Sequence, residues 1–458
     1  MNAAAQSRPD IHRLQQGPIL STLLRLAVPS VLAMAMQVLV SIAETIYIGR
    51  LGITPLAAMA LVFPFLMLSQ QLSAGAMGGG VSSAVSRALG ASNHERATAL
   101  AFHALAIGSL LGILYTALML LFGPAFYRLL GGQGEVLETA IQYSSVLFFS
   151  AFFLWLSNSL ASILRGTGNM QIPSLGILVA SVLQIALGAL LTFGAGPVPA
   201  MGMIGVAIAT IVANAASVTF FAWYLIRGPS RLKLQLRGVK LQREMFLDIL
   251  KVGALSMISP LQSVLTVLIL TGFVARLGEL PLAGYAIGQR LEFLLIPISF
   301  GIGVAALPMV GMAIGAGNVS RARRVAWTAG ATSAFNLALI GLAVFIAPDL
   351  WAGMFTTDEA VLAYARQFLQ IAGPAFPFFG LGMTLYFASQ GSGKMLGPVI
   401  AGTVRLGLVV AVGAWLGSTQ ASSGQYFALI AAAMVVYGFS VVTAVKLTRW
   451  APRLPVAR

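Results

Sequence analysis

Long apolar runs recur along almost the whole chain, and they limit the possible folds more than any other feature. A helix needs roughly 20 residues to cross a hydrocarbon core of about 30 Å. Runs of that length recur from Ile19 to Lys446. Only 9% of the residues are charged and 58% are hydrophobic, whereas an average soluble domain has roughly 25% charged residues. The sequence therefore predicts an all-α integral membrane protein.

Twelve membrane-spanning helices are predicted from these runs. Their expected ranges are 20–49, 55–88, 97–122, 140–164, 172–194, 202–226, 247–275, 281–314, 325–348, 363–390, 396–417 and 425–447. The first run is far longer than the 7–15 apolar residues of a signal peptide, so we expect it to remain as the first helix.

The chain repeats itself at a spacing of about half its length. At a shift of 226 residues, GRLGITPLAAMA (49–60) aligns with ARLGELPLAGYA (275–286) without a gap. At a shift of 225, RGTGNMQIP (165–173) aligns with QGSGKMLGP (390–398), and Gly90 with Gly315. The chain is therefore predicted to form two lobes of six helices each.

An even number of helices in each copy brings both copies into the membrane from the same side. The two lobes are then related by pseudo-two-fold symmetry about the membrane normal, as in the parallel-repeat class of transporters, and this arrangement favours a transport function. The predicted parts are an N-terminal segment 1–19, an N-terminal lobe 20–227, a basic linker 228–246, a C-terminal lobe 247–448 and a tail 449–458.

Basic residues concentrate on one side of the predicted membrane. That side holds Arg8, Arg13, Arg87, Arg96, Arg165, Arg227, Arg231, Lys233, Arg237, Lys240, Arg243, Arg321, Arg323, Arg324, Lys394, Lys446, Arg449, Arg453 and Arg458. The other side holds little more than Arg50, Arg128, Arg276 and Arg366. By the positive-inside rule, both termini and the linker are predicted to be cytoplasmic. The net charge of +15 is thus explained by topology, and we expect no nucleic-acid partner.

Catalytic and metal-binding patterns are not found in the sequence. The chain has no cysteine, which excludes disulfides, thiolate catalysis and Cys-ligated metals. Its three histidines, at positions 12, 94 and 103, are scattered. We therefore expect neither an enzyme nor a metal site, and no cofactor other than an ion gradient.

Of the twelve acidic residues, ten fall in loops or at the ends of the predicted helices, and two, Glu44 and Glu292, lie within the apolar runs. A charge at the centre of a bilayer costs about 2.5–3.5 kcal/mol, so acids kept there usually face a cavity and take part in function. The repeat places Leu270 at the position equivalent to Glu44, so packing alone does not require an acid there. The alternative is that Glu44 snorkels outward or pairs with Arg50, six residues away.

Glu292 has a basic neighbour in the sequence, Arg290. Residues two positions apart do not face each other on a helix, so the two are not a simple local ion pair. Two interpretations remain open for Glu292. It is either part of a structural charge pair in the second lobe or a residue of cation binding and coupling.

Motifs in both halves resemble the multidrug and toxic compound extrusion (MATE) family, in its bacterial members. They include LAVPS, AETIYIGRLG, SAGAMGGGVSSAVSRALGASNHERA and LRGTGNMQIP in the first half, and YAIGQRLEFLLIPISFGIG and FGLGMTLYFASQGSGK in the second. The resemblance covers residues from about 20 to about 450. It implies a twelve-helix antiporter of the bacterial cytoplasmic membrane that exports cationic, amphipathic compounds against a proton or sodium gradient.

The resemblance also implies roles for individual residues. Glu44 matches the first-helix acid of the family, and Gln37 a polar position of the same cavity. Pro29 matches a first-helix proline whose kink is proposed to gate that cavity, and Asn158 matches a polar residue of the fourth helix. The DinF-like branch, closest in its first-helix acid, carries Asn and Asp on the fifth helix, where this chain has Gln184 and Gly188. The acids that the other large branch carries on its seventh and tenth helices are Ser263 and Phe379 here.

Glu44 is therefore the best candidate for ion coupling, with Gln37 beside it and Glu292 next. A carboxylate removed from water tends to hold either a proton or a cation, so a cationic drug and a proton would compete for it. We favour protons; sodium would need several oxygen ligands, to which Gln37, Ser41 and Thr45 would contribute.

Candidates for substrate binding are the polar residues Gln37, Ser41, Asn158 and Gln184 and the apolar residues Met34 and Phe153. Met and aromatic side chains suit varied apolar cations, although such residues more often face lipid or neighbouring helices. A lipid-linked-sugar or polysaccharide flippase of the same superfamily is the alternative function. The protein is expected to act as a monomer.

Overall fold

The computed structural model describes residues 11–234, 240–419 and 421–450. The predicted N-terminal segment, linker and tail lie partly outside these described residues, at positions 1–10, 235–239 and 451–458. Eleven described helices are long and apolar enough to cross a membrane, and a bent pair of helices makes a twelfth span. The described residues contain no β-strand, only an isolated bridge between Ala195 and Val198. The prediction of a twelve-span, all-α membrane protein is confirmed.

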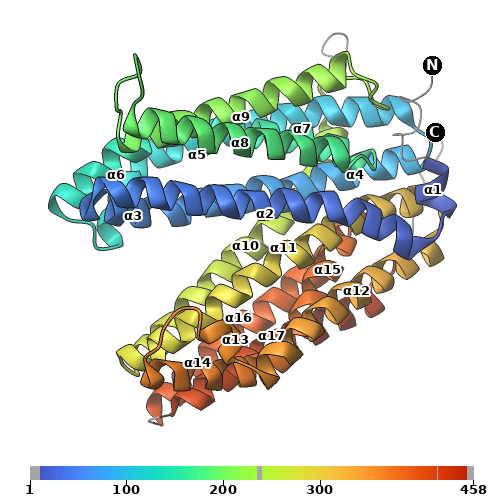
Figure 1. Ribbon diagram of the computed structural model, residues 1–458. Coiled ribbons are helices and arrows are strands. Elements are labelled where there is room, and N and C mark those ends of the chain that lie inside the picture. Colours follow the sequence, from blue (N-terminus) through green and yellow to red (C-terminus); the bar gives the residue numbers. More distant parts are fainter. Residues whose placement is uncertain (1–10, 235–239, 420, 451–458) are drawn as a thin grey trace. The chain divides into compact units, whose positions relative to one another are not determined.

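The described chain forms two compact units (Figure 1). The first unit contains residues 28–254, and the second contains 11–27 and 255–450. Helices α2 and α10 each contribute to both units, because each begins in one unit and ends in the other.

The described part of the first unit is built from eight α-helices and one π-helical segment, besides the part of α10 that it holds. Its elements are α2 (Ile19–Leu51, from residue 28), α3 (Ile53–Gln70), η1 (Gln71–Met77), α4 (Gly78–Gly90), α5 (His94–Leu129), α6 (Gly134–Leu147), α7 (Phe149–Gly166), α8 (Gln171–Phe193) and α9 (Met203–Ile226). Helix α8 packs along α9, and α5 along α7 (Figure 1). Helices α6 and α7 are bent by 42° where they meet and together form one span.

The second unit repeats this order. Its elements are α1 (Ile11–Gln16), α10 (Arg243–Ala275, from residue 255), α11 (Glu279–Gly315), α12 (Val319–Ile346), α13 (Asp349–Ala352), α14 (Glu359–Ala372), η2 (Gly373–Ala375), α15 (Phe376–Ser392), α16 (Leu396–Ser418) and α17 (Ser423–Leu447). Equivalent helices also begin in the same way. The Asn93 side chain accepts a hydrogen bond from Arg96 N at the start of α5, and Asn318 does the same for Arg321 N at the start of α12.

Most helix ends lie close to the predicted ones, and α5 shows why one of them does not. We predicted an end at residue 122, before the Gly123-Pro124 pair, but α5 continues through Pro124 to Leu129. Proline removes one hydrogen bond from a helix. The loss of that one bond does not end α5. The helix ends at Leu129, and two residues later Gly131 adopts a positive φ of 92°.

The π-helical segment η1 explains why the repeat is offset by 226 residues in one place and 225 in another. The first-unit span from Ile53 to Gly90 has 38 residues, whereas the equivalent α11 has 37 and is continuous α-helix. The first copy therefore holds one extra residue, and a π-helical turn takes up such an insertion. Ser69, near the end of α3, and Ser73, inside η1, accept hydrogen bonds from Trp155 and Asn158 of α7.

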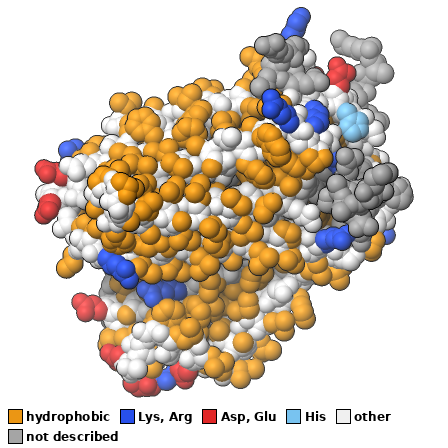
Figure 2. Space-filling model, turned by 45° about the horizontal axis from the view of Figure 1, so that its top comes forward, with side chains coloured by type: hydrophobic (Ala, Val, Ile, Leu, Met, Phe, Trp, Pro, Cys, Tyr) orange, Lys and Arg blue, Asp and Glu red, His pale blue; other side chains and the backbone are white. Residues whose placement is uncertain are grey.

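Large apolar side chains cover much of the outer surface of these helices. Examples are Leu110, Leu114 and Leu121 of α5 and Leu339 and Leu342 of α12, all exposed. On the face shown in Figure 2, hydrophobic side chains predominate and charged side chains are few. Such a surface is suited to contact with lipid chains.

Candidate functional site

Glu44 of α2 lies inside the first unit and is 7% exposed. Its carboxylate oxygen Oε1 accepts a hydrogen bond of 2.7 Å from Nε2 of Gln184 on α8 and one of 3.3 Å from Oγ1 of Thr210 on α9. Gln184 Nε2 also donates to Thr210 Oγ1, at 3.1 Å. The three side chains form a polar cluster, which we call the Glu44 site.

The side chains that hydrogen-bond to Glu44 are both uncharged. It forms no ion pair with any described residue, and the neighbouring Arg50 is exposed. Tyr143 of α6, 3% exposed, is close enough to interact electrostatically with the carboxylate. The other carboxylate oxygen, Oε2, makes no hydrogen bond to the described residues. Glu44 therefore brings an unneutralised negative charge to the interior whenever it is ionised.

The helices that carry the site are held in register near it. Tyr47, one turn after Glu44, donates through its hydroxyl to the carbonyl oxygen of Ile185 at 3.3 Å, which ties α2 to α8 beside Gln184. Gly188 of α8 faces the Tyr47 ring, since a Cβ there would lie 3.4 Å from it. At the position where the resemblance implied an acid, this chain thus has a glycine beside an aromatic ring.

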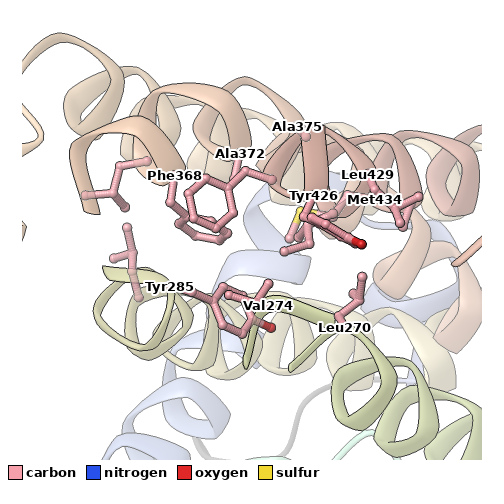
Figure 3. Packing of buried hydrophobic residues seen from close by; sticks show 14 of the residues in the cluster. Leu270, Val274, Tyr285, Phe368, Ala372, Ala375, Tyr426, Leu429 and Met434 are labelled. Atoms are coloured by element: carbon pink, nitrogen blue, oxygen red, sulfur yellow. The ribbon is translucent and has the colours of Figure 1, made fainter. Parts of the chain in front are cut away.

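The second unit has an apolar core at the equivalent positions. Leu270, equivalent to Glu44, is 5% exposed, and Val409, equivalent to Gln184, is fully buried. Both belong to one hydrophobic cluster with Val274, Tyr285 and Tyr426. Figure 3 shows Leu270, Val274 and Tyr285 packed against side chains of α14 and α17. The same backbone positions thus carry a buried acid with polar partners in one unit and apolar packing in the other.

Three other predicted residues, Gln37, Ser41 and Pro29, lie on the same helix as Glu44. Gln37 is half-buried and lies seven residues before Glu44, on the same face of α2. Ser41 is one turn from Glu44, and its carbonyl accepts from Thr45 Oγ1. Pro29 lies inside α2, near its first third.

Of the predicted site residues, Gln184 alone is hydrogen-bonded to Glu44 in the described part of the chain. Three others lie on α7 or farther along α2. Asn158 donates to Ser73 Oγ at 2.8 Å and belongs to the network around η1. Phe153 is half-buried against Phe152, with ring centroids 5.3 Å apart. Met34, half-buried, lies ten residues before Glu44 on α2, or about 15 Å along the axis.

Glu292 of α11 lies in the second unit, and its charge partner is not Arg290. Arg290 is exposed, with its guanidinium 5.1 Å from the centroid of the Phe355 ring. Glu292 interacts electrostatically instead with Arg405 of α16. Sequence reasoning missed Arg405, although it lies in the middle of an apolar run, where a basic residue is as unusual as an acid.

Thr210 was also missed, because a threonine in an apolar helix gives no signal unless its partners are known. Among the described residues, no group of three or more His, Asp or Glu side chains is placed to hold a metal ion.

The fold and the buried polar cluster define a multi-pass helical membrane transporter. Residues 29–190 and 256–416 match the MatE family model, one match in each half. The chain belongs to the MatE family, as its motifs indicated.

Known proteins are similar to the chain over most of its length. It is 24% identical over 436 residues to the multidrug export protein MepA of Staphylococcus aureus (strain N315), covering 93% of this chain and 95% of that protein. It is 25% identical over 377 residues to the probable multidrug resistance protein YoeA of Bacillus subtilis (strain 168), covering 81% of each.

Solved structures show the same likeness. One is a MOP superfamily transporter from Pyrococcus furiosus, 26% identical with a TM-score of 0.86, covering 96% of this chain and 98% of that one. A MATE protein in a straight conformation is 25% identical with a TM-score of 0.87, with the same coverage. A MATE protein in a bent conformation is 26% identical with a TM-score of 0.86, covering 95% of this chain and 96% of that one.

Proposed function

We propose that this protein is a secondary active multidrug antiporter that exports cationic, amphipathic compounds in exchange for protons. The observation that carries the proposal is the buried Glu44 carboxylate, whose hydrogen-bond partners are all neutral. The printed names of the similar proteins, multidrug export protein MepA and probable multidrug resistance protein YoeA, support the substrate class.

The chemistry of the Glu44 site supports exchange. Removal from water disfavours a bare carboxylate, so a proton or a bound cation stabilises it. Gln184 and Thr210 occupy Oε1, which leaves Oε2 to accept a proton or to meet a cationic group. A protonated Glu44 no longer attracts a cation, and a bound cation disfavours protonation. Export of the cation and entry of the proton are thereby linked at one carboxyl group.

The same geometry favours a proton over sodium. A sodium ion needs several oxygen ligands around it, whereas both partners of Glu44 present hydrogen-bond donors to its Oε1. Glu44 is also the one carboxylate in the cluster. A proton needs a single acceptor oxygen.

Pro29 is the proposed hinge of the first helix. Its ring removes a backbone N–H from the interior of α2 and weakens the helix there, so that α2 bends at lower cost. Similar proteins have been solved in a straight and in a bent conformation. Bending at Pro29 would change the exposure of Gln37 and Glu44, which follow it on the same helix.

The basic residues on one side of the membrane support the proposed orientation. Both termini and the linker then face the cytoplasm, and the protein lies in the cytoplasmic membrane of a bacterium. Its acidic site lies nearer the outer end of α2, six residues before Arg50.

Transport by purified protein in liposomes loaded with ethidium tests the proposal. A pH jump and a sodium jump are applied separately to wild type, Glu44→Gln and the control Glu279→Gln, which changes an acid at the start of α11. We expect the pH jump to move ethidium in wild type and control but not in Glu44→Gln. Movement driven by sodium alone would overturn the proton assignment. Full transport by Glu44→Gln would overturn the role of Glu44, and no movement with either gradient would favour the flippase.

A further inference from the structure

A groove with a volume of about 430 Å³ lies between α16 and α17 of the second unit. Its lining residues fall between positions 397 and 404 on α16 and between positions 439 and 447 on α17. The α16 stretch is roughly 10 Å long, about a third of a hydrocarbon core of about 30 Å. The groove thus has the length of part of one membrane leaflet.

Small residues form the inner part of this groove and large apolar residues flank it. A Cβ on Gly397 would lie 2.7 Å from the Cβ of Ala444, so the two helices approach closely there. Ala401 is 2% exposed, whereas Ile400 and Phe439 are 52% and 56% exposed. All the lining residues are uncharged. The groove is therefore suited to an apolar chain rather than to a polar ligand.

The equivalent place in the first unit is filled by the protein itself. Helix α8 is equivalent to α16, and Gly176 is equivalent to Ala401 at the shift of 225 residues. A Cβ on Gly176 would lie 2.3 Å from the ring of Phe221 on α9, and Phe221 is fully buried. An aromatic ring thus packs against this position in the first unit, while Ala401 lines an open groove in the second. The fold therefore does not require the groove.

Basic residues lie at one end of the groove, where α16 begins and α17 ends. Lys394 comes three residues before Gly397, and Lys446 lies in the last turn of α17. Arg323 of α12 donates through Nη2 to the carbonyl oxygen of Thr448 at 2.9 Å. The Thr448 hydroxyl in turn lies 3.7 Å from the position of a Cβ on Gly397. These contacts place the Arg323 guanidinium near the same end of the groove.

The positive charge at this end is not balanced by acids. The chain has no Asp or Glu after Glu359, so α16 and α17 carry none. Lys394, Lys446 and Arg449 take part in none of the ion pairs between described residues, and Lys446 and Arg449 are exposed. Basic pockets between membrane helices bind anionic lipid head groups. An apolar groove that ends at such charges matches a ligand with an apolar chain and an anionic head.

We propose that this groove binds an anionic phospholipid, with an acyl chain between α16 and α17 and the phosphate against the basic residues at its end. In the proposed orientation these residues face the cytoplasm, and the cytoplasmic leaflet carries the negative surface potential of anionic lipids. A second copy of the chain is less suited to the groove. A two-fold symmetric dimer would bring the same basic ends together.

Native mass spectrometry of the purified full-length protein in detergent tests the head-group contact. Phosphatidylglycerol and phosphatidylcholine with the same acyl chains are added separately, and we expect wild type to bind phosphatidylglycerol more tightly. The double variant Lys446→Gln with Arg449→Gln should bind phosphatidylglycerol about thirtyfold more weakly, since it removes two basic residues near the head group. The control is Arg50→Gln with Arg276→Gln, which removes two exposed arginines that follow Gly49 and Ala275. We expect the control to bind phosphatidylglycerol as wild type does.

A second pair of variants tests the apolar part of the groove. Thr443 lines the groove and is exposed, so Thr443→Phe places a ring in the groove without disturbing buried packing. We expect it to weaken phosphatidylglycerol binding about tenfold, because the acyl chain loses contact area worth roughly two methylene groups. Ala432→Phe is the matched control, since Ala432 is an exposed residue of α17 that does not line the groove.

Four results would overturn the proposal. Wild type would bind the two lipids equally, or each variant would bind phosphatidylglycerol as its control does. A dimer that only Thr443→Phe dissociates would assign the groove to a second copy of the chain. Displacement of phosphatidylglycerol by ethidium would assign it to a transported compound. The measurement uses no ion gradient, so its outcome is independent of the proposed antiport.

Discussion

The side-chain nitrogen of Gln184 lies 2.7 Å from the Glu44 carboxylate, although 140 residues separate the two in the chain. The contact joins α2 to α8, and Thr210 extends it to α9. Because Gln184 carries no charge, it holds the carboxylate in place without neutralising it. An amide can also turn its oxygen toward a protonated acid, so it can adapt to both states of Glu44.

Substitution of Gln184 by Met should impair transport while the protein still reaches the membrane. Met has a similar length but no donor, so Oε1 of a buried carboxylate loses its shortest hydrogen bond, a loss worth about 1–3 kcal/mol. We expect pH-driven ethidium transport in liposomes to fall about tenfold. Gln289→Met is the control, since it removes a half-buried glutamine that donates to Tyr285 in the second unit. Equal losses in both variants would contradict a specific role for Gln184.

Deletion of Ala74 should be tolerated by the fold. Ala74 lies inside η1, the segment that takes up the extra residue of the first unit, and α11 shows that the span forms with 37 residues. The deletion would convert the π-helical turn to α-helix and leave both flanking segments in register. We expect the midpoint of thermal unfolding in detergent to drop by only a few degrees, about 1–2 kcal/mol.

The control is deletion of Leu66, in the regular α-helical part of the same span. There the missing residue rotates the N-terminal part of α3 by about 100° relative to its C-terminal part. We expect loss of folded protein on size-exclusion chromatography. Similar yields of folded protein from the two deletions would contradict the interpretation that η1 accommodates the extra residue of the first unit.

An ion cluster at the start of α10 should contribute measurably to stability. Asp248 accepts from Arg87 of α4 at 2.8 Å and from Arg96 of α5 at 3.2 Å, and Arg96 also pairs with Glu244 at 2.8 Å. The Asp248 side chain is 29% exposed, whereas that of Glu244 is 71% exposed.

Asp248→Asn removes the negative charge that two arginines share. We expect it to lower the free energy of unfolding by about 1–3 kcal/mol, and Glu244→Gln to lower it by no more than about 1 kcal/mol. Denaturant or thermal unfolding in low and high salt measures both effects. If Glu244→Gln is as damaging as Asp248→Asn, exposure does not govern the strength of these pairs.

Gly80→Ala should be strongly destabilising because α4 and α10 approach closely there. A Cβ on Gly80 would lie 2.7 Å from the backbone nitrogen of Gly253, and backbone cannot move aside as a flexible side chain does. Gly49→Ala is the matched control, since a Cβ at this helical glycine meets no described atom within 4 Å. We expect a large loss of folded Gly80→Ala, seen as low yield and a lowered midpoint of thermal unfolding, and a neutral or slightly stabilising effect of Gly49→Ala.

The twelve spans and the repeat could be predicted because both depend on strong local signals. An apolar run of about 20 residues is long enough to cross a membrane as a helix. Glycine, proline and arginine recur at the same spacing in both halves of the chain, which reveals the repeat. The bend between α6 and α7 could not be predicted, since no proline or glycine lies at Phe148 where the two helices meet.

The site was predictable only in part. Glu44 is conspicuous because an acid in an apolar run is rare. Its partners Gln184 and Thr210 lie 140 and 166 residues away, and their contact depends on the packing of α2, α8 and α9. Arg405 is visible in the sequence as a basic residue within an apolar run, but its electrostatic interaction with Glu292 is seen only in the structure.

The division of α2 and α10 between the two units bears on how the protein is made. Residues 11–27 leave the ribosome well before the rest of their unit. Their contacts, such as the hydrogen bonds from Arg321 to the carbonyls of Leu14 and Gly17, form only with chain synthesised some three hundred residues later. The first unit likewise needs residues up to 254, beyond the linker. Neither half of the gene would therefore encode a complete folding unit, and a protein cut at the linker would have to assemble from both pieces together.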